Sequence, residues 1–259
     1  MTTTVLQISD CHLVVEGTLL VGVDTQASLE AVLQQAYSKH TPDAIIASGD
    51  IAHDATRDVY ARFLDTVRKQ TQAPLLSLPG NHDVLGVMHA AGLPMSPLEL
   101  GCWSLVALDS HEDDLPVALI TPADKQRTAR DLAQARGEHC LLATHHPLLA
   151  INCPWLDKDR IQNGTELLEW FSECSAQNGD TRLRGVVFGH AHQEIENTLG
   201  KLPVYGAPST CFQFKPHSTT FTPDTLSPGY RWLYLSDDGQ IATQVHRVDS
   251  FPIHIQLDR

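Results

Sequence analysis

The chain has 259 residues, of which 31 are acidic and 18 basic, so that its formal net charge is −13. About 42% of the residues are hydrophobic, which is enough to bury the core of one large α/β domain. The negative charge argues against nucleic acid and against an anionic membrane surface as partners, because both bind to a basic face.

The N-terminal segment and the cysteines indicate the compartment. Residues 1–5 lack a basic region followed by an apolar stretch, so we expect no signal peptide, and no apolar run approaches the roughly 18 residues of a transmembrane helix. The six cysteines are scattered without a Cys-x-x-Cys pair, which is typical of reduced thiols. We expect Cys11 to be a small core residue and the protein to be soluble and cytoplasmic, as a monomer or a homodimer.

Short apolar segments alternate with helical patterns as far as about residue 190. The apolar segments are 5–8, 43–47, 74–78, 103–108, 140–143 and 186–188. Amphipathic spacing predicts helices over 25–37, 56–69, 121–134 and 165–174, with Thr56 as an N-cap and Pro122 in a first turn. This alternation predicts βαβ units with parallel strands covered on both faces.

After about residue 200 the pattern predicts strands without intervening helices. These strands are 202–205, 211–214, 230–235 and 240–246, with Asp238-Gly239 as a hairpin turn between the last two. We expect these antiparallel strands to form a second sheet packed on the first. The chain shows no repeat or linker, which favours one domain over 1–259, and two long loops at about 145–162 and 203–228 are expected to shape a substrate site.

Five short motifs rich in metal-ligand residue types each follow one of the buried apolar segments. They are Asp10-Cys11-His12, Gly49-Asp50, Gly80-Asn81-His82-Asp83, His145-His146-Pro147 and Gly189-His190-Ala191-His192. Each motif alone also occurs in ordinary turns, so the prediction depends on all five occurring together in this order. Ligands in α/β sheets bind beyond the carboxyl ends of the strands, where all five motifs are expected.

The spacing within the motifs suits metal binding. Asp10 and His12 are two residues apart, so on an extended strand end both side chains point the same way. The same holds for His190 and His192. Gly49 allows the backbone to turn and direct the next carboxylate, that of Asp50, inward.

Asn81 adds a neutral amide oxygen to this set, and His82 points into the same space. Carboxylate, amide and imidazole ligands together suit iron, manganese or zinc, and no thiolate cluster indicates a purely structural zinc site. The five motifs therefore predict a binuclear metal site that hydrolyses a phosphate ester.

This ordered set, which spans residues 10–192, resembles the calcineurin-like metallophosphoesterases. The resemblance implies an α/β fold of four layers, an αββα sandwich of two mixed β-sheets flanked by helices. It also implies two metal ions, iron and manganese with zinc as the alternative, in which Asp50 bridges both ions. The remaining ligands would be Asp10, His12 and His192 for one ion and Asn81, His145 and His190 for the other.

His82 corresponds to the family histidine that contacts the phosphate and protonates the leaving group. The resemblance implies that the substrate lies against His12, Asp50, Asn81, His82 and His192. Two cations roughly 3.5–4 Å apart would polarise the phosphoryl oxygens and bridge a hydroxide that attacks phosphorus in line.

Three further segments, 153–157, 209–214 and 227–232, look like the bacterial class III 3′,5′-cyclic AMP phosphodiesterases. The implied reaction is hydrolysis of cyclic AMP, a small-molecule cyclic nucleotide, to 5′-AMP. Aromatic residues of these segments either belong to the core or cover the adenine, where stacking contributes about 1–3 kcal/mol. They are Trp155, Phe212, Phe214 and Trp232.

Two other functions remain open. One is the same mechanism on another small diester, such as a 2′,3′-cyclic nucleotide, cyclic GMP or a glycerophosphodiester. The other is a non-catalytic metal-binding scaffold, although scaffolds of this fold typically lack the histidine that corresponds to His82.

The sequence departs from the family pattern at two places. Some relatives carry extra histidines before the proline of the His145-His146-Pro147 motif, so His146 is the alternative to His145 as the ligand. Some relatives also have an acid where His53 stands, three residues after the bridging Asp50, and this acid can orient the catalytic histidine. Asp54 either takes that role or caps the next helix. Other histidines without such context are expected at the surface, namely His40, His89, His139 and His254.

Overall fold

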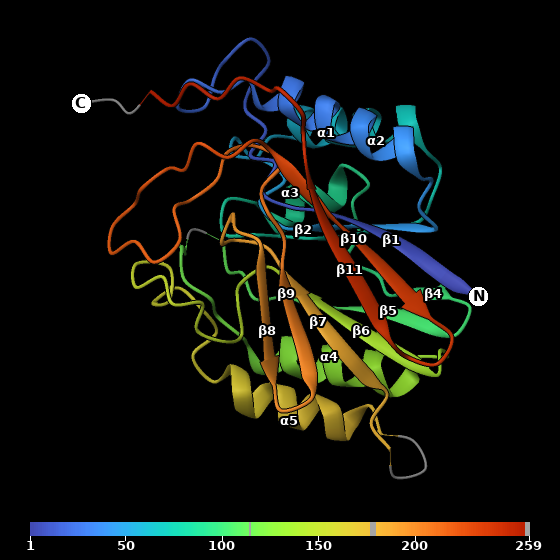
Figure 1. Ribbon diagram of the computed structural model, residues 1–259. Helices are drawn as coiled ribbons and strands as arrows, with labels where there is room; N and C mark the ends of the chain where they lie inside the picture. The colour runs from blue at the N-terminus through green and yellow to red at the C-terminus, as the bar shows by residue number, and fades with distance from the viewer. Residues whose placement is uncertain (114, 177–179, 257–259) are drawn as a thin grey trace.

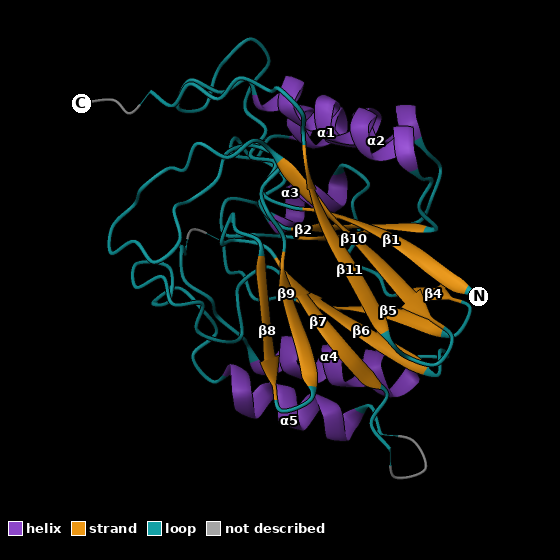
Figure 2. Ribbon diagram, in the orientation of Figure 1, coloured by secondary structure: helices purple, strands orange, loops and turns teal. Residues whose placement is uncertain are grey.

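Two β-sheets pack face to face in the computed structural model, which describes residues 1–113, 115–176 and 180–256 (Figures 1 and 2). The first sheet has the order β11-β10-β1-β2-β3 and the second β4-β5-β6-β7-β9-β8. The strands of the first are β1 (Thr2–Ile8), β2 (Ala44–Ser48), β3 (Leu75–Leu78), β10 (Gly229–Ser236) and β11 (Ile241–Arg247). Those of the second are β4 (Leu98–Leu100), β5 (Trp103–Leu108), β6 (His139–Thr144), β7 (Leu183–Phe188), β8 (Ile195–Leu199) and β9 (Leu202–Gly206).

Helices cover the outer face of each sheet, as Figure 2 shows. The first sheet carries α1 (Thr25–Lys39), α2 (Arg57–Gln70) and the short α3 (Leu85–Ala90), and the second carries α4 (Pro122–Gln134) and α5 (Gly164–Cys174). The hydroxyl of Thr56 accepts a hydrogen bond from Val59 N and caps α2, while Thr121 caps α4 through Asp124 N. No helix among the described residues combines the length and apolar character needed to cross a bilayer.

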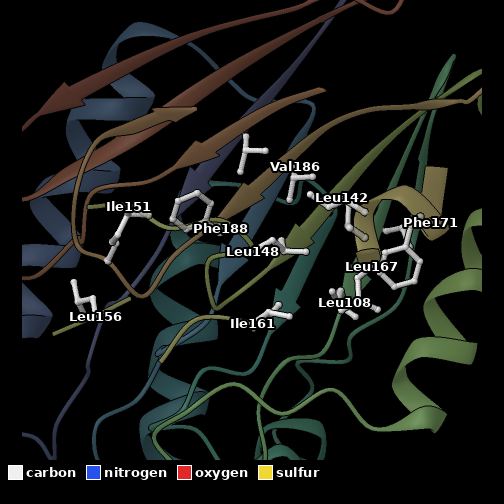
Figure 3. Packing of buried hydrophobic residues seen from close by; sticks show 14 of the residues in the cluster. Leu108, Leu142, Leu148, Ile151, Leu156, Ile161, Leu167, Phe171, Val186 and Phe188 are labelled. Atoms are coloured by element: carbon white, nitrogen blue, oxygen red, sulfur yellow. The ribbon is translucent and has the colours of Figure 1, made fainter. Parts of the chain in front are cut away.

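Three hydrophobic clusters separate the four layers. Successive residues of a strand point to opposite faces, so Val5 packs between the sheets while Leu6 packs with Leu29 of α1. In the second sheet Leu105 faces the interior between the sheets and Val106 faces the outer helices. Figure 3 shows this outer cluster, in which residues of the sheet, Leu108, Leu142 and Val186, lie with Leu167 and Phe171 of α5. The fold is therefore the expected αββα sandwich.

The parallel core of each sheet positions the site. β1, β2 and β3 run parallel in the first sheet, and β5, β6 and β7 run parallel in the second. Hairpins extend both sheets, with β10–β11 paired to β1 and β8–β9 paired to β7, and β4 pairs antiparallel with β5 at the other edge of the second sheet. The carboxyl ends of β1, β2, β3, β6 and β7 are therefore the places where the five motifs begin.

Most of the expected elements are present, and three expectations are wrong. Residues 211–214 form no strand, although Phe214 makes an isolated bridge to Pro223. The C-terminal strands do not form a sheet of their own, because one hairpin extends each sheet. His139, expected at the surface, is buried beside Trp103, with Nε2 3.0 Å from the carbonyl oxygen of Asp237. Patterning did not predict α3, β4 or β8, which are short or, in β8, mostly exposed.

Candidate functional site

Five of the predicted ligands adopt backbone conformations that side-chain-bearing residues rarely adopt. Each has a positive φ angle: 53° at Asp10, 45° at His12, 49° at Asp50, 61° at His190 and 50° at His192. Such conformations cost about 1–3 kcal/mol each and persist only where the surrounding fold enforces them. They occur directly after β1, β2 and β7, where the chain turns sharply instead of remaining extended as expected for the two pairs Asp10/His12 and His190/His192. The side chains still gather in one buried space. This concentration of strain marks the strand ends as a functional site.

The first group of donor atoms is formed by Asp10, His12, His192 and Asp50. His12 Nε2 lies 3.1 Å from His192 Nε2 and 3.5 Å from Asp50 Oδ2. His192 Nε2 lies 3.5 Å from Asp10 Oδ1. All four side chains are buried. Lone pairs of nitrogen and oxygen thus gather within a single coordination sphere, where only a cation or protons relieve their mutual repulsion.

The second group is formed by Asn81, His145, His190 and the other carboxylate oxygen of Asp50. Asn81 Oδ1 lies 3.0 Å from His190 Nδ1 and 3.2 Å from His145 Nε2. His145 Nε2 is also 3.5 Å from Asp50 Oδ1. The carboxylate of Asp50 therefore faces the first group with Oδ2 and the second with Oδ1. This is the geometry expected of a ligand that bridges two cations.

Backbone carbonyls orient two of these imidazoles. His145 Nδ1 lies 2.9 Å from the carbonyl oxygen of Ser48, and His192 Nδ1 lies 2.6 Å from that of Phe212. A carbonyl only accepts, so Nδ1 carries the proton in both rings and donates it. The lone pair of Nε2 is then directed at the other donors, which is the usual arrangement of a metal-binding histidine.

The electrostatics keep the histidines neutral. Burial lowers the pKa of His190 and of His192 to about 3, and it lowers the pKa of His12 well below its ordinary value. Burial also raises the pKa of Asp10 well above the ordinary value, and the adjacent Asp50 raises it further. Although burial opposes it, His145 and His12 in their protonated form and the backbone N–H of His82 hold the pKa of Asp50 below its usual range. Metal ions bind neutral imidazole, so the histidines have the required protonation state.

Buried polar atoms without partners occur in both groups. In the described part of the chain, Asp10 Oδ2, His12 Nδ1 and His190 Nε2 are buried and make no hydrogen bond. Such atoms are rare in folded proteins and call for an ion or another partner. His12 and His190 face the donor groups with the other nitrogen of each ring, so the fit to metal depends on the donors themselves, whose mixture of oxygen and nitrogen suits a pair of cations such as iron, manganese or zinc.

Glycine is required at two of the strand ends. Gly49 has a φ angle of 95°, and a Cβ atom there would collide with the imidazole of His145. A Cβ on Gly189 would collide with Ser9 Oγ and with the carbonyl oxygen of Ser48. Both positions thus lie where the loops from the two sheets meet, and only a residue without a side chain permits that approach.

His82 lies at the edge of the donor groups and is exposed to the adjoining cavity. Its ring is 4.9 Å from that of His12 and 4.8 Å from that of His53, measured between centroids. His53 stacks on His82 with an interplanar angle of 28°. Asp54 has a different place, because its Oδ2 accepts a hydrogen bond from Val15 N at 2.9 Å. The helix cap is Thr56, so Asp54 takes neither of the two roles considered for it.

Asp83 is a supporting residue to which the motif alone assigned no role. Its carboxylate accepts hydrogen bonds from the backbone N–H groups of Ile51, Ala52 and Gly80 and from the hydroxyl of Tyr60, at 2.8 to 3.1 Å. It therefore ties the loop after β3 to the loop after β2. The position of Asp83 at the end of the Gly80–Asp83 motif was the feature of the sequence that could have identified it as a supporting residue.

His146 and His145 differ in what they face. His146 Nδ1 lies 2.9 Å from Ser110 Oγ, and its Nε2 is buried without a hydrogen-bond partner among the described residues. The ring of His146 lies 4.7 Å from the ring of His190. His145, by contrast, faces Asn81 and Asp50 directly. His146 also belongs, with His145 and His190, to a group whose ligand atoms lie within 4.8 Å of one another, so both adjacent histidines lie within reach of an ion.

A cavity of about 220 Å³ opens above the donor groups. Its floor includes His12, Asp50, Asn81, His82, His190 and His192. Its wall includes Trp155, Phe214 and Phe221, and the ring of Phe214 stacks on His192 at 4.1 Å. Of the four aromatic residues considered from the sequence, Trp232 is a core residue of the first sheet and Phe212 packs in the outer core of the second. The sequence pattern did not single out Phe221.

Comparison with known proteins gives consistent results. Residues 3–194 match the family model described as calcineurin-like phosphoesterase. The chain is 35% identical to the 3′,5′-cyclic adenosine monophosphate phosphodiesterase CpdA of Escherichia coli (strain K12) over 94% of this chain and 89% of that protein. It is 36% identical to CpdA of Pseudomonas aeruginosa over 98% and 93% of the two chains. The solved structure of TT1561 from Thermus thermophilus covers 96% of this chain, and this chain covers 100% of that structure. The TM-score is 0.61 at 12% sequence identity, so this likeness shows the fold alone. The chain belongs to the calcineurin-like phosphoesterase family.

Proposed function

We propose that this protein is a binuclear-metal phosphodiesterase that hydrolyses 3′,5′-cyclic AMP to 5′-AMP. The observation that carries the proposal is the convergence of seven side chains from five strand ends, six of which gather around the carboxylate of the seventh, Asp50. These side chains are Asp10, His12, Asp50, Asn81, His145, His190 and His192. Gathering so many lone pairs in one buried space costs stability unless positive charge neutralises them. The arrangement therefore supports the binding of cations.

We assign one ion to Asp10, His12 and His192 and the other to Asn81, His145 and His190, with Asp50 shared. Iron and manganese are the proposed pair, with zinc as the alternative, because the donors are oxygen and nitrogen without thiolate. When bound, two such cations neutralise the phosphoryl oxygens and lower the pKa of a coordinated water. The mixture of carboxylate, amide and imidazole in the buried groups supports this assignment.

His82 is the proposed general acid. It borders the cavity beside His12, and its backbone N–H donates to Asp50 Oδ1 at 2.9 Å, which fixes the loop that carries it. From this position the imidazole can hydrogen-bond to a phosphate oxygen and give its proton to the leaving oxygen of the ester. His12, Asp50, Asn81 and His192 line the same floor and would contact the phosphate with it.

The cavity and the relatives support cyclic AMP as the substrate. An apolar wall next to a polar floor suits a molecule with a flat base at one end and a phosphodiester at the other. The relatives whose names specify cyclic AMP align over almost the whole chain. Another small diester is the alternative substrate, because the metal site on the floor does not distinguish one base from another.

The proposal extends to the whole chain as one domain, residues 1–259. Both sheets contribute donors, since Asp10, Asp50 and Asn81 follow strands of the first and His145, His190 and His192 follow strands of the second. Separating the sheets would divide the site. A cytoplasmic location is supported by the six free cysteines.

The test is product identification with defined metal loading. The protein is freed of metal with a chelator, reloaded with Mn²⁺, Fe²⁺ or Zn²⁺, and given cyclic AMP, cyclic GMP, a 2′,3′-cyclic nucleotide, a glycerophosphodiester and bis(p-nitrophenyl) phosphate. We expect metal-dependent conversion of cyclic AMP to 5′-AMP. Turnover of the aryl diester without hydrolysis of cyclic AMP would support the proposed mechanism and exclude cyclic AMP as the substrate. No turnover of any diester by protein loaded with metal would indicate a scaffold.

A further inference from the structure

One acidic residue, Asp159, is among the residues that line the otherwise apolar wall of the cavity above the proposed metal site. The wall is formed by Pro116, Trp155, Leu156, Phe214 and Phe221, and the other charged residue that lines the cavity is Asp50 on the floor. Asp159 comes from the loop between β6 and α5 and thus reaches the cavity from the second sheet. A single carboxylate among aromatic side chains favours a ligand that has a flat ring with a hydrogen-bond donor at its edge.

The backbone of Asp159 is held on both sides. Its N–H donates to the carbonyl oxygen of Leu156 at 2.9 Å, and its carbonyl oxygen accepts from Ala118 N at 3.0 Å. Two residues earlier, Asp157 accepts hydrogen bonds from Ile151 N at 2.7 Å and from Cys153 N at 3.1 Å. Asp157 therefore shapes the loop, and Asp159 is placed at the cavity by backbone contacts.

The carboxylate of Asp159 is available to a ligand. It makes no hydrogen bond or ion pair with any residue that the structure describes, and the nearby guanidinium of Arg160 donates to the carbonyl oxygen of Asp157 at 2.6 Å. Asp159 is partly buried, and this burial raises its pKa although the charge of Lys158 acts in the opposite direction. A hydrogen-bond donor that reaches this oxygen thus competes with less water than at an open surface.

The aromatic wall provides a surface for a flat ring and no competing polar group. The indole N–H of Trp155 is already used, because it donates to Ser218 Oγ at 2.9 Å. Trp155, Phe214 and Phe221 contact one another edge to face, with centroids 4.9 to 5.7 Å apart. Phe221 is 44% exposed and so presents a free face. A purine that lies on this wall needs a polar partner for its edge, and Asp159 is the group placed to supply it.

We propose that Asp159 is a specificity-determining residue whose carboxylate accepts a hydrogen bond from the exocyclic amine of a purine base lying against Trp155 and Phe221. The inference rests on the proposed function, since it assigns the base of the cyclic nucleotide to this wall and its phosphate to the floor. Adenine carries that amine at C6. A purine without it leaves the carboxylate desolvated and unpaired, and such a loss costs more than the hydrogen bond itself contributes.

The experiment compares two substrates in the wild-type protein and in variants at position 159. Cyclic AMP is compared with the 3′,5′-cyclic phosphate of purine riboside, which has the same ring and phosphate and lacks the 6-amino group. The ratio of kcat/KM for the two substrates is measured in the wild-type protein and in the variants Asp159→Ala and Asp159→Asn, each loaded with Mn²⁺. Because each ratio is internal to one protein, a general loss of activity cancels.

We expect the wild-type protein to favour cyclic AMP roughly tenfold, mainly through KM. The ratio should fall to about one in Asp159→Ala, where no acceptor remains. Asp159→Asn keeps a carbonyl acceptor without the charge and should give an intermediate ratio. Asp65→Ala, which removes an exposed carboxylate from α2 outside the cavity, should keep the wild-type ratio.

Two results would overturn the inference. One is a wild-type protein that hydrolyses both cyclic nucleotides equally well, a measurement that needs no variant to fold. The other is a ratio in Asp159→Ala equal to that of the wild type. Failure of the proposed function is distinguishable, because it would show as no hydrolysis of either cyclic nucleotide by a protein that still cleaves bis(p-nitrophenyl) phosphate.

Discussion

The carboxylate of Asp50 accepts a hydrogen bond from the backbone N–H of His82, with Oδ1 2.9 Å from N. The same oxygen lies 3.5 Å from His145 Nε2, while Oδ2 lies 3.5 Å from His12 Nε2. One side chain thus joins both donor groups to the loop that carries the proposed general acid. Its replacement should disturb metal binding and catalysis together.

Asp50→Ala is therefore expected to abolish activity and to remove bound metal from both groups. The physical reason is that the carboxylate supplies one oxygen to each group and the negative charge that offsets the cations. The measurement is metal content per chain by mass spectrometry alongside turnover of bis(p-nitrophenyl) phosphate. Asp54→Ala is the matched control, since Asp54 hydrogen-bonds to Val15 N and lies outside both groups. A variant at position 50 that kept two metal ions would refute the bridging assignment.

His82→Ala should lower the rate while metal is retained. A general acid typically contributes about 10²–10⁴-fold, and it contributes most when the leaving oxygen is a poor leaving group. The loss should thus be much larger for cyclic AMP, which expels an alkoxide, than for bis(p-nitrophenyl) phosphate. His89→Ala, at an exposed histidine of α3, serves as the control. An equal loss on both substrates would argue against proton donation by His82.

Replacing His145 and His146 one at a time distinguishes a metal ligand from a residue that only supports the site. His145→Ala should eliminate one of the two metal ions, because Nε2 faces both Asn81 and Asp50. His146→Ala should weaken binding by about 10–100-fold without eliminating it, since the His146 ring packs on the ring of His190 and Nδ1 contacts Ser110. Calorimetric titration with Mn²⁺ measures both. The reverse order of effects would make His146 the ligand.

A buried histidine outside the metal site predicts a loss of stability in mild alkali. Burial alone would lower the pKa of His111, but Asp109 and Asp113, 3.1 and 3.0 Å from its ring nitrogens, raise it to about 9. Because the folded pKa exceeds the unfolded value of about 6.5, the contribution is complete below about pH 6.5 and is lost as pH rises through about 9.

The measurement for His111 is the melting temperature of chelated protein from pH 8 to pH 10. We expect the wild-type melting temperature to fall across this window and that of His111→Gln to be lower at pH 8 and to change less. Burial lowers the pKa of His190 and of His192 to about 3, so these histidines affect stability only near and below pH 6.5, where the unfolded chain takes up their protons. Parallel curves for the two proteins would exclude this ion-pair cluster as the cause.

Local pattern was sufficient for the central strands and for most helices. The apolar run 103–108 and the helix that begins at Pro122 were predicted nearly to the residue, because burial on both faces and a proline in the first helical turn both act over a few residues. The segment 211–214 shows the opposite case. Its alternation is typical of a strand, yet the carbonyl oxygen of Phe212 instead holds His192 Nδ1. A contact with a residue twenty positions away outweighed a local preference.

The sequence by itself determined which residue types end the buried strands, and therefore that carboxylate, amide and imidazole donors would lie at one edge of the sheets. The tertiary structure decided which nitrogen of each ring faces the site, that His53 rather than Asp54 lies against His82, and that Asp159 enters the cavity. The physical reason is that strand order and loop packing set these distances. They join segments more than a hundred residues apart, such as Asp10 and His190, between which no local pattern carries information.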